Sequence, residues 1–341
     1  MNRRTARLRE AARRALTQYD LAVRQVRLRL DVWNCLFRVD AADGARYVLR
    51  LTARRGCHGV DETWAEIAWV DALQRETTLA VRRPVAMRDG SFVGVLDDDL
   101  APDHHQHVLF EWRPGRTPGA RLGVRTAFRL GRFAASLHEH ARTFTLASGR
   151  ARRFDHVFPY ADTTFADREP ILLFDERFAH LLTRELRAAY ERGRHAAQAV
   201  IDELFAGTQP PRLIHNDLHP WNILLHDGGL VALDFEDLMW GYPIQDIATT
   251  FYYLRIRDNG ESLETAYRRG YETIAPWPVA QPETLTSLVA GRGLILANGV
   301  LAAPDAAERD TASHYLPLIG ARIARWLPRR TPDGSCRSYC L

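Results

Sequence analysis

The feature that most constrains this chain is the stretch 213–247, LIHNDLHPWNILLHDGGLVALDFEDLMWGYPIQDI. Apolar runs at 213–214, 223–225 and 230–233 alternate with polar residues, which predicts short strands joined by a polar loop and a tight turn. The turn lies at the Asp-Gly-Gly of 227–229, because glycine accepts the positive φ that a hairpin connection usually demands. The stretch therefore predicts short strands that carry a polar loop between them.

Three polar residues follow one another in a fixed order along these predicted strands. Asp217 and Asn222 lie in the loop, and Asp234 comes directly after the last strand. Phosphoryl transfer from a nucleotide needs a carboxylate to accept the proton of a hydroxyl, and an amide oxygen and a second carboxylate to hold a cation. Solvated loop residues would explain any one of the three, but the ordered set between apolar strands favours a phosphotransferase.

The segments HNDLHPWNIL and LDFED resemble the aminoglycoside phosphotransferase and choline kinase-like family, the small-molecule branch of the protein kinase-like fold. The resemblance implies an α+β fold with two lobes, a small antiparallel sheet with one helix and a larger, mainly helical lobe. It implies that Asp217 is the catalytic base and that Asn222 and Asp234 bind Mg²⁺ across the phosphates of ATP. It also implies supporting roles for His215 in the loop and for Asp246, which would tie the loop to the following helix.

Alternating apolar residues also predict strands near the N-terminus. They occur at 26–30 and 37–39, and the segment 47–51, YVLRL, follows a turn signal. The connection 31–35 between the first two strands lies where a kinase-like lobe covers the nucleotide phosphates, and it contains no glycine. Its backbone amides are predicted to cap phosphate, with Asn34 among the cofactor-binding residues.

The resemblance also assigns residues that would hold the nucleotide. Arg50 lies where a strand cation contacts the α- and β-phosphates, and Glu66, on a helix predicted at about 61–75, would pair with it. The alternatives are an arginine on the surface of an edge strand and a plain exposed glutamate. The next long strand would lead into a hinge, where backbone groups near Glu111 and Trp112 would hydrogen-bond the adenine edge.

The Arg-Pro-Gly break after this hinge predicts the domain boundary. We expect residues 1–114 to form the nucleotide-binding lobe and 115–327 the catalytic and substrate lobe. The tail 328–341 is rich in Arg, Pro and Gly and is predicted to be disordered. The segment 1–16 predicts a solvated helix, not a secretory signal, and no apolar run approaches the roughly 20 residues of a membrane span, so a cytoplasmic location is expected.

Composition excludes several other functions. The chain contains no lysine, so it has neither a P-loop nor the amine that Schiff-base or pyridoxal phosphate chemistry needs. The net charge of +4 is mild and the arginines are dispersed, which argues against nucleic-acid binding. The four cysteines are predicted to be free thiols, and the histidine-rich segment 97–107 is predicted to be a solvated loop, not a metal site.

A short segment separates Asp234 from Asp246, and it leaves no room for the peptide-docking segment of protein kinases. A small acceptor is therefore expected. Acidic and aromatic side chains near the loop would hold a cationic acceptor by charge and cation–π contact. These substrate candidates are Glu236, Asp237, Trp240 and Tyr242. The alternative is that the aromatic residues belong to the core of the following helix.

The sequence thus favours an ATP-dependent phosphotransferase that acts on a hydroxyl of an aminoglycoside-, choline- or homoserine-like acceptor. Two alternatives remain open. One is a protein serine/threonine kinase of the bacterial stress-response type with the same fold, and the other is a non-catalytic nucleotide-binding protein. The sequence leaves the oligomeric state undetermined.

Overall fold

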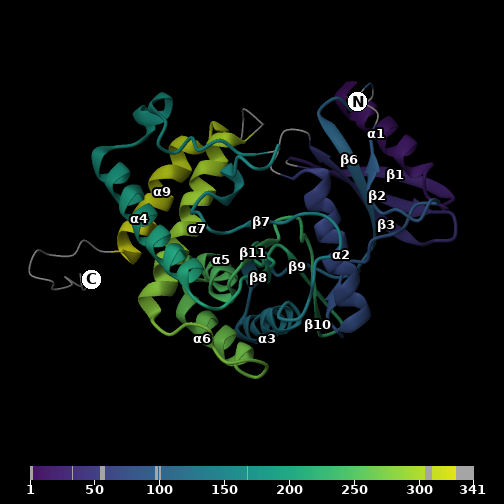
Figure 1. Cartoon of the computed structure of the whole chain (residues 1–341). Coiled ribbons are helices and arrows are strands. Elements are labelled where there is room, and N and C mark those ends of the chain that lie inside the picture. Colours follow the sequence, from purple (N-terminus) through teal and green to yellow (C-terminus); the bar gives the residue numbers. More distant parts are fainter. Residues whose placement is uncertain are drawn as a thin grey trace, which may run out of the picture.

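The computed structural model describes residues 3–32, 34–53, 58–96, 99, 101–166, 168–303 and 309–327. Within them the chain forms an N-terminal lobe around an antiparallel sheet and a larger, mainly helical lobe (Figure 1). The predicted two-lobed α+β architecture is confirmed, but two helices accompany the sheet where one was predicted. The predicted tail 328–341 lies outside the described residues, as do Trp33, Cys57, Cys336 and Cys340.

The N-terminal sheet has five strands in the order β1-β2-β3-β6-β5. Their bounds are β1 Val23–Asp31, β2 Asn34–Ala41, β3 Arg46–Ala53, β5 Gly94–Val95 and β6 His104–Glu111. The predicted solvated loop at 97–107 needs a correction, because His104 and His107 are buried at the start of β6 and the Tyr19 hydroxyl lies 3.1 Å from His107 Nδ1. Of that segment, residues 97, 98 and 100 lie outside the described residues.

A helix covers each face of this sheet. Helix α1, Arg3–Leu16, buries residues at spacings of three and four, from Leu8 to Leu16, against sheet residues such as Phe37. The prediction of a solvated helix was therefore wrong for this face. On the opposite face, Ile67 of helix α2, Val60–Glu76, packs with residues of β6.

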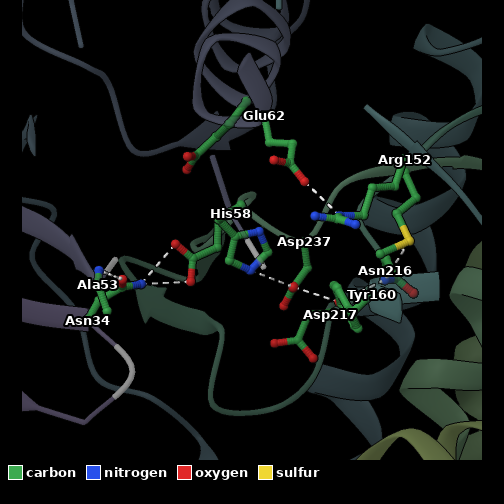
Figure 2. A network of polar contacts seen from close by, with 12 residues as sticks. Asn34, Ala53, His58, Glu62, Arg152, Tyr160, Asn216, Asp217 and Asp237 are labelled. Atoms are coloured by element: carbon green, nitrogen blue, oxygen red, sulfur yellow. Dashed lines mark hydrogen bonds and ion pairs between the residues drawn. The ribbon is translucent and has the colours of Figure 1, made fainter. Parts of the chain in front are cut away.

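Helix α2 is also attached to the second lobe. The indole of Trp69 is fully buried and donates a hydrogen bond of 3.2 Å to Nδ1 of His140. Arg152 forms an ion pair of 2.6 Å with Glu62 (Figure 2). Gly149, at a φ of +76°, runs so close to the helix that a Cβ there would lie 2.3 Å from a backbone nitrogen of α2. These three contacts hold α2 against the larger lobe.

Within the described residues the larger lobe contains six long helices, and Figure 1 shows them on the side away from the N-terminal sheet. They are α3 Val124–His140, α4 Arg184–Ala206, α5 Pro243–Arg255, α6 Gly260–Tyr271, α7 Pro282–Ala302 and α9 Ala312–Trp326. Helices α3 and α6 cross at glycines, and a Cβ at Gly131 or at Gly270 would lie 1.9 Å from a carbonyl oxygen of the other helix.

Helix α7 corrects one expectation from the sequence. It is long and apolar enough to cross a membrane by length and composition, whereas the sequence analysis expected no such run. However, 72% of the most apolar 18-residue stretch of this helix is buried inside the fold, where the helix packs against α4, α5 and α9. The apolar surface of α7 is therefore mostly covered by protein.

Among the described residues, six short strands form two further three-stranded sheets, β4-β10-β9 and β7-β11-β8. Their bounds are β4 Ala80–Val81, β7 Arg152–Arg153, β8 Arg212–Ile214, β9 Ile223–His226, β10 Gly229–Ala232 and β11 Met239–Gly241. The predicted strands at 213–214, 223–225 and 230–233 are confirmed. In the predicted turn, however, the positive φ values fall on Asp227 and Gly228, at 46° and 74°. The polar loop lies between β8 and β9.

Candidate active site

A cavity of about 660 Å³ lies between the sheet, α2, the polar loop after β8 and one face of α7. Part of its sheet side is apolar, and includes Leu30 and Val32, which are 47% and 44% exposed. Further apolar residues of the sheet that line it are Leu36, Val48, Ala53 and Phe110. An apolar slot of this kind suits the flat face of a purine base. The opposite wall is strongly polar.

The polar loop is held by a buried carboxylate. Asp246 lies in the first turn of α5 and accepts hydrogen bonds from the backbone nitrogens of His215 and Asn216, at 3.2 and 2.8 Å. His138 contacts the same carboxylate at 3.0 Å. Burial opposes ionisation of Asp246, but these donors outweigh it and hold its pKa below the usual value. These bonds fix the loop while Asn216 takes a φ of 62°, which turns the next residue, Asp217, into the cavity.

Asp217 presents an oriented carboxylate. Its Oδ2 accepts a hydrogen bond of 2.6 Å from Asn222 Nδ2 and lies 3.3 Å from His219 Nε2, and its Oδ1 is paired with Arg292. Arg292 is itself held by the hydroxyl of Tyr253 at 3.1 Å. Burial opposes ionisation of Asp217, but His219 and Arg292 outweigh it and lower its pKa. The carboxylate is therefore ionised and fixed in position.

Asn222 and Asp234 lie on neighbouring backbone segments, because the backbone nitrogen of Leu233 donates a hydrogen bond of 2.9 Å to the backbone carbonyl oxygen of Asn222. The amide nitrogen of Asn222 is used to orient Asp217, and no hydrogen bond among the described residues uses its Oδ1. Asp234 faces the cavity with a φ of 61° and makes no hydrogen bond or ion pair with any described residue. Its depth in the cleft and the nearby charge of Glu236 raise its pKa well above the usual value.

A carboxylate and an amide oxygen without partners, on adjacent segments, fit a hard divalent cation that takes its remaining ligands from phosphate and water. Within the described ranges, no three His, Cys, Asp or Glu residues lie close enough to hold a metal ion by themselves. A cation at Asn222 and Asp234 would therefore depend on the phosphate groups of a bound nucleotide.

Arg50 and Glu66 meet as the resemblance implied. The guanidinium of Arg50 contacts both carboxylate oxygens of Glu66, at 3.0 and 2.5 Å, and both residues are buried. Glu236 is a second partner of Arg50 at 3.2 Å, and it also accepts two hydrogen bonds from Asn34, at 2.8 and 2.9 Å. Asn34 thus links the connection between β1 and β2 to the polar wall, and Figure 2 shows its side chain turned that way.

The hinge residues are placed differently. The cavity wall ends at Phe110, so the side chains of Glu111 and Trp112 do not line it. The backbone nitrogen of Glu111 donates to Arg83 and that of Trp112 to Arg46, at 2.8 and 2.9 Å. The assignment of these two residues to the adenine edge stays a prediction, and it applies only to their carbonyl groups.

The four substrate candidates separate into two pairs. Asp237 and Glu236 line the cavity, and Asp237 accepts hydrogen bonds from Tyr160 and His58, at 2.6 and 3.2 Å (Figure 2). Burial opposes ionisation of Asp237, but the hydrogen bonds from these partners outweigh it and lower its pKa.

The structure does not bring Trp240 and Tyr242 to the cavity. Trp240 lies in β11 and Tyr242 follows it, and both side chains pack against the core of the larger lobe. The Tyr242 hydroxyl donates to the Gln209 carbonyl at 2.8 Å and its ring packs on Phe205. Tyr242 is buried in the core and Trp240 packs half-buried against it, which agrees with the alternative stated for these aromatic residues, so we no longer assign them to the acceptor.

One face of α7 supplies residues that the sequence analysis did not single out. Positions at spacings of three and four line the cavity: Arg292, Ile295, Leu296, Gly299 and Val300. A Cβ added at Gly299 would meet no atom within 4 Å, so the cavity is open beside it. Arg292 had one sequence signal, since it is the only charged residue after Glu283 in an otherwise apolar helix.

Glu169 is a second residue of the cavity that the sequence did not reveal. Burial raises the pKa of its carboxyl to about 7, although Asn298 donates a hydrogen bond of 2.5 Å to it. Asp237 adds to this rise by its charge. Glu169 and Asp237 therefore form an acidic region at the end of the cavity beyond Asp217.

The raised pKa of Glu169 predicts how stability changes with pH. The folded protein binds a proton that the unfolded chain releases between its ordinary pKa of 4.5 and about 7, so the free energy of unfolding should fall as the pH rises through this window. Glu169→Gln should flatten that fall, as measured by urea midpoints from about pH 5 to about pH 7.5. The exposed Glu176→Gln serves as control. An unchanged slope in Glu169→Gln would contradict the assignment.

Comparisons with known proteins agree with this architecture. The sequence model of the phosphotransferase enzyme family matches residues 24–282. The amicoumacin kinase of Bacillus subtilis (strain 168) is 25% identical over 243 residues, which are 70% of this chain, and the match spans 66% of the length of that kinase.

Among solved structures, a microcompartment-associated aminopropanol kinase has a TM-score of 0.71 at 23% identity, over 92% of this chain and 96% of its own. An amicoumacin kinase in complex with AMP-PNP, Ca²⁺ and Ami has a TM-score of 0.71 at 18% identity, over 93% and 95%. A spectinomycin phosphotransferase in complex with ADP and spectinomycin has a TM-score of 0.60 at 12% identity, over 94% and 98%. These likenesses show that the chain has the fold of these kinases.

Proposed function

The chain belongs to the phosphotransferase enzyme family, and on that basis we propose that it transfers the γ-phosphate of ATP to a hydroxyl group of a small molecule. The observation that carries the proposal is the geometry at Asp217, an ionised carboxylate fixed by Asn222 and Arg292 beside the unpartnered carboxylate of Asp234. A hydroxyl that donates to Asp217 would be oriented for attack, and the carboxylate would accept its proton.

Asn222 and Asp234 would hold Mg²⁺ in this scheme. The cation supplies neutralisation of the charge on the phosphate oxygens. Asn222 donates its amide hydrogens to Asp217, which turns its oxygen away from the base and toward the metal side. Arg50, fixed by Glu66, lies on the nucleotide side of the same cavity, and the apolar residues of the sheet would enclose the base.

The acceptor end of the cavity favours a small molecule. The face of α7 that includes Ile295 and Gly299 forms a wall beyond Asp217, which restricts a polypeptide acceptor more than a compact one. We therefore place the protein kinase alternative second. The ionised carboxylate of Asp237, with the carboxyl group of Glu169 in the same cavity, suits an amino alcohol whose amine meets these oxygens.

The test is an acceptor screen with the full-length protein, ATP and Mg²⁺. The acceptors are aminopropanol, amicoumacin, spectinomycin, choline, homoserine and a neutral sugar, with a protein extract as a separate arm, and mass spectrometry detects each phosphorylated product. We expect an amine-bearing alcohol to be phosphorylated. Phosphate found only on protein would favour the second candidate, and nucleotide binding without any transfer would refute the proposal.

A further inference from the structure

The charge of Arg50, the arginine assigned to the phosphates, is already neutralised in this structure. Its guanidinium contacts Glu66 twice and Glu236 once. Two carboxylates against one guanidinium leave no net positive charge at Arg50 for a phosphate group. A triphosphate that enters here meets no excess of positive charge from Arg50 and its partners.

Another arginine of the same cavity, Arg82, has no hydrogen-bond or ion-pair partner among the described residues. Arg82 follows strand β4, whose residues Ala80 and Val81 pair in parallel with Val231 and Ala232 of β10. This register places Arg82 beside the segment that leads to Asp234, and Arg82 lines the cavity. Its Nε is buried without a hydrogen-bond partner, and the side chain makes no hydrogen bond or ion pair with any residue that the structure describes.

Keeping such a cation in the cleft is costly. Arg82 is half-buried with its Nε fully shielded, and a guanidinium that is partly removed from water without a hydrogen-bond partner loses hydration that no protein group replaces. Consistent with this, burial lowers the pKa of Arg82, and only part of that effect is offset by Asp234 and Glu66. The neighbouring Arg83 carries the same charge at no such cost, since 61% of its side chain is exposed.

We propose that Arg82 is a nucleotide-binding residue whose guanidinium contacts the phosphates of the bound nucleotide and supplies the positive charge that Arg50 lacks. The inference rests on the nucleotide binding of the proposed function. In a chain without lysine, only arginine can supply a permanently charged side chain for this purpose. The bound phosphates would be the missing partner of Arg82.

The experiment compares ligands that share the adenine base but differ in phosphate number. Calorimetry measures the binding of adenosine, ADP and AMP-PNP with Mg²⁺ to the wild type, Arg82→Gln and Arg82→Lys, with Arg83→Gln as the matched control. A charge-assisted hydrogen bond is worth enough to make AMP-PNP bind about 10- to 100-fold more weakly to Arg82→Gln. Adenosine binding should be unchanged, Arg82→Lys should recover most of the AMP-PNP affinity, and Arg83→Gln should resemble the wild type.

Thermal unfolding without ligand separates this role from a structural one. Because Arg82→Gln removes an unpaired charge from the cleft, its melting temperature should equal or exceed that of the wild type. A lower melting temperature with equal losses for adenosine and AMP-PNP would overturn the proposal, as would unaltered AMP-PNP affinity in Arg82→Gln. If the wild type itself binds no adenine nucleotide, the proposed function fails, and this inference fails with it.

Discussion

Asp217→Asn should lower the turnover of phosphate transfer about 10³-fold while it leaves nucleotide affinity unchanged. The asparagine keeps the shape of the side chain but cannot accept the hydroxyl proton, and it also loses the charge that Arg292 and His219 face. The measurement is steady-state turnover on the acceptor that the screen identifies, together with calorimetry of AMP-PNP.

The matched control for this variant is Asp227→Asn. Asp227 lies in the hairpin after β9 with 87% of its side chain exposed. Its substitution removes one carboxylate that does not line the cavity, so it controls for the loss of charge alone. Its turnover should equal that of the wild type. If Asp217→Asn keeps more than about one tenth of the wild-type turnover, well above the fraction left after loss of a general base, Asp217 is not the base.

Asp246→Ala should lower the free energy of unfolding by about 3–5 kcal/mol, the cost of removing one partner from a buried charged pair. The substitution leaves the backbone nitrogens of His215 and Asn216 and the ring of His138 without their common acceptor. None of these groups reaches water, since all three residues are fully buried.

Urea unfolding followed by tryptophan fluorescence measures this loss, with the exposed Asp258→Ala as control. The loss of Asp246 should also release the loop, so turnover per folded molecule should fall under conditions in which the variant remains native. A decrease in the free energy of unfolding of less than about 1 kcal/mol, the size expected for a surface ion pair, would contradict the role described for Asp246.

The sequence predicted the part of the site that local pattern can encode. The strands around 213–234 have apolar runs bounded by turn residues. Asp217, Asn222 and Asp234 follow one another along them within 18 residues, so their association can be recognised from the sequence alone. Arg50 and Glu66 came from the family resemblance, and the structure joins them. Their roles in catalysis stay predictions until the variants are measured.

The rest of the cavity comes from distant segments. Arg82 reaches it from the residue after β4, Glu169 from the region before α4 and Arg292 from α7, and no spacing in the sequence relates them to Asp217. Conversely, Trp240 and Tyr242 lie near the loop in sequence, but their side chains pack against the core of the larger lobe. Proximity along the chain was a poor guide wherever tertiary packing decided the direction of a side chain.

The attachment of α2 has a consequence for control of the protein. Glu66 belongs to a helix that Trp69, Glu62 and the backbone at Gly149 fasten to the larger lobe. Swinging this helix outward, a common way to switch off a kinase, would break a buried ion pair and expose a large indole. The pairing of Glu66 with Arg50 is thus established when the chain folds. The rate of phosphate transfer should therefore depend on the concentrations of nucleotide and acceptor, with no separate activation step.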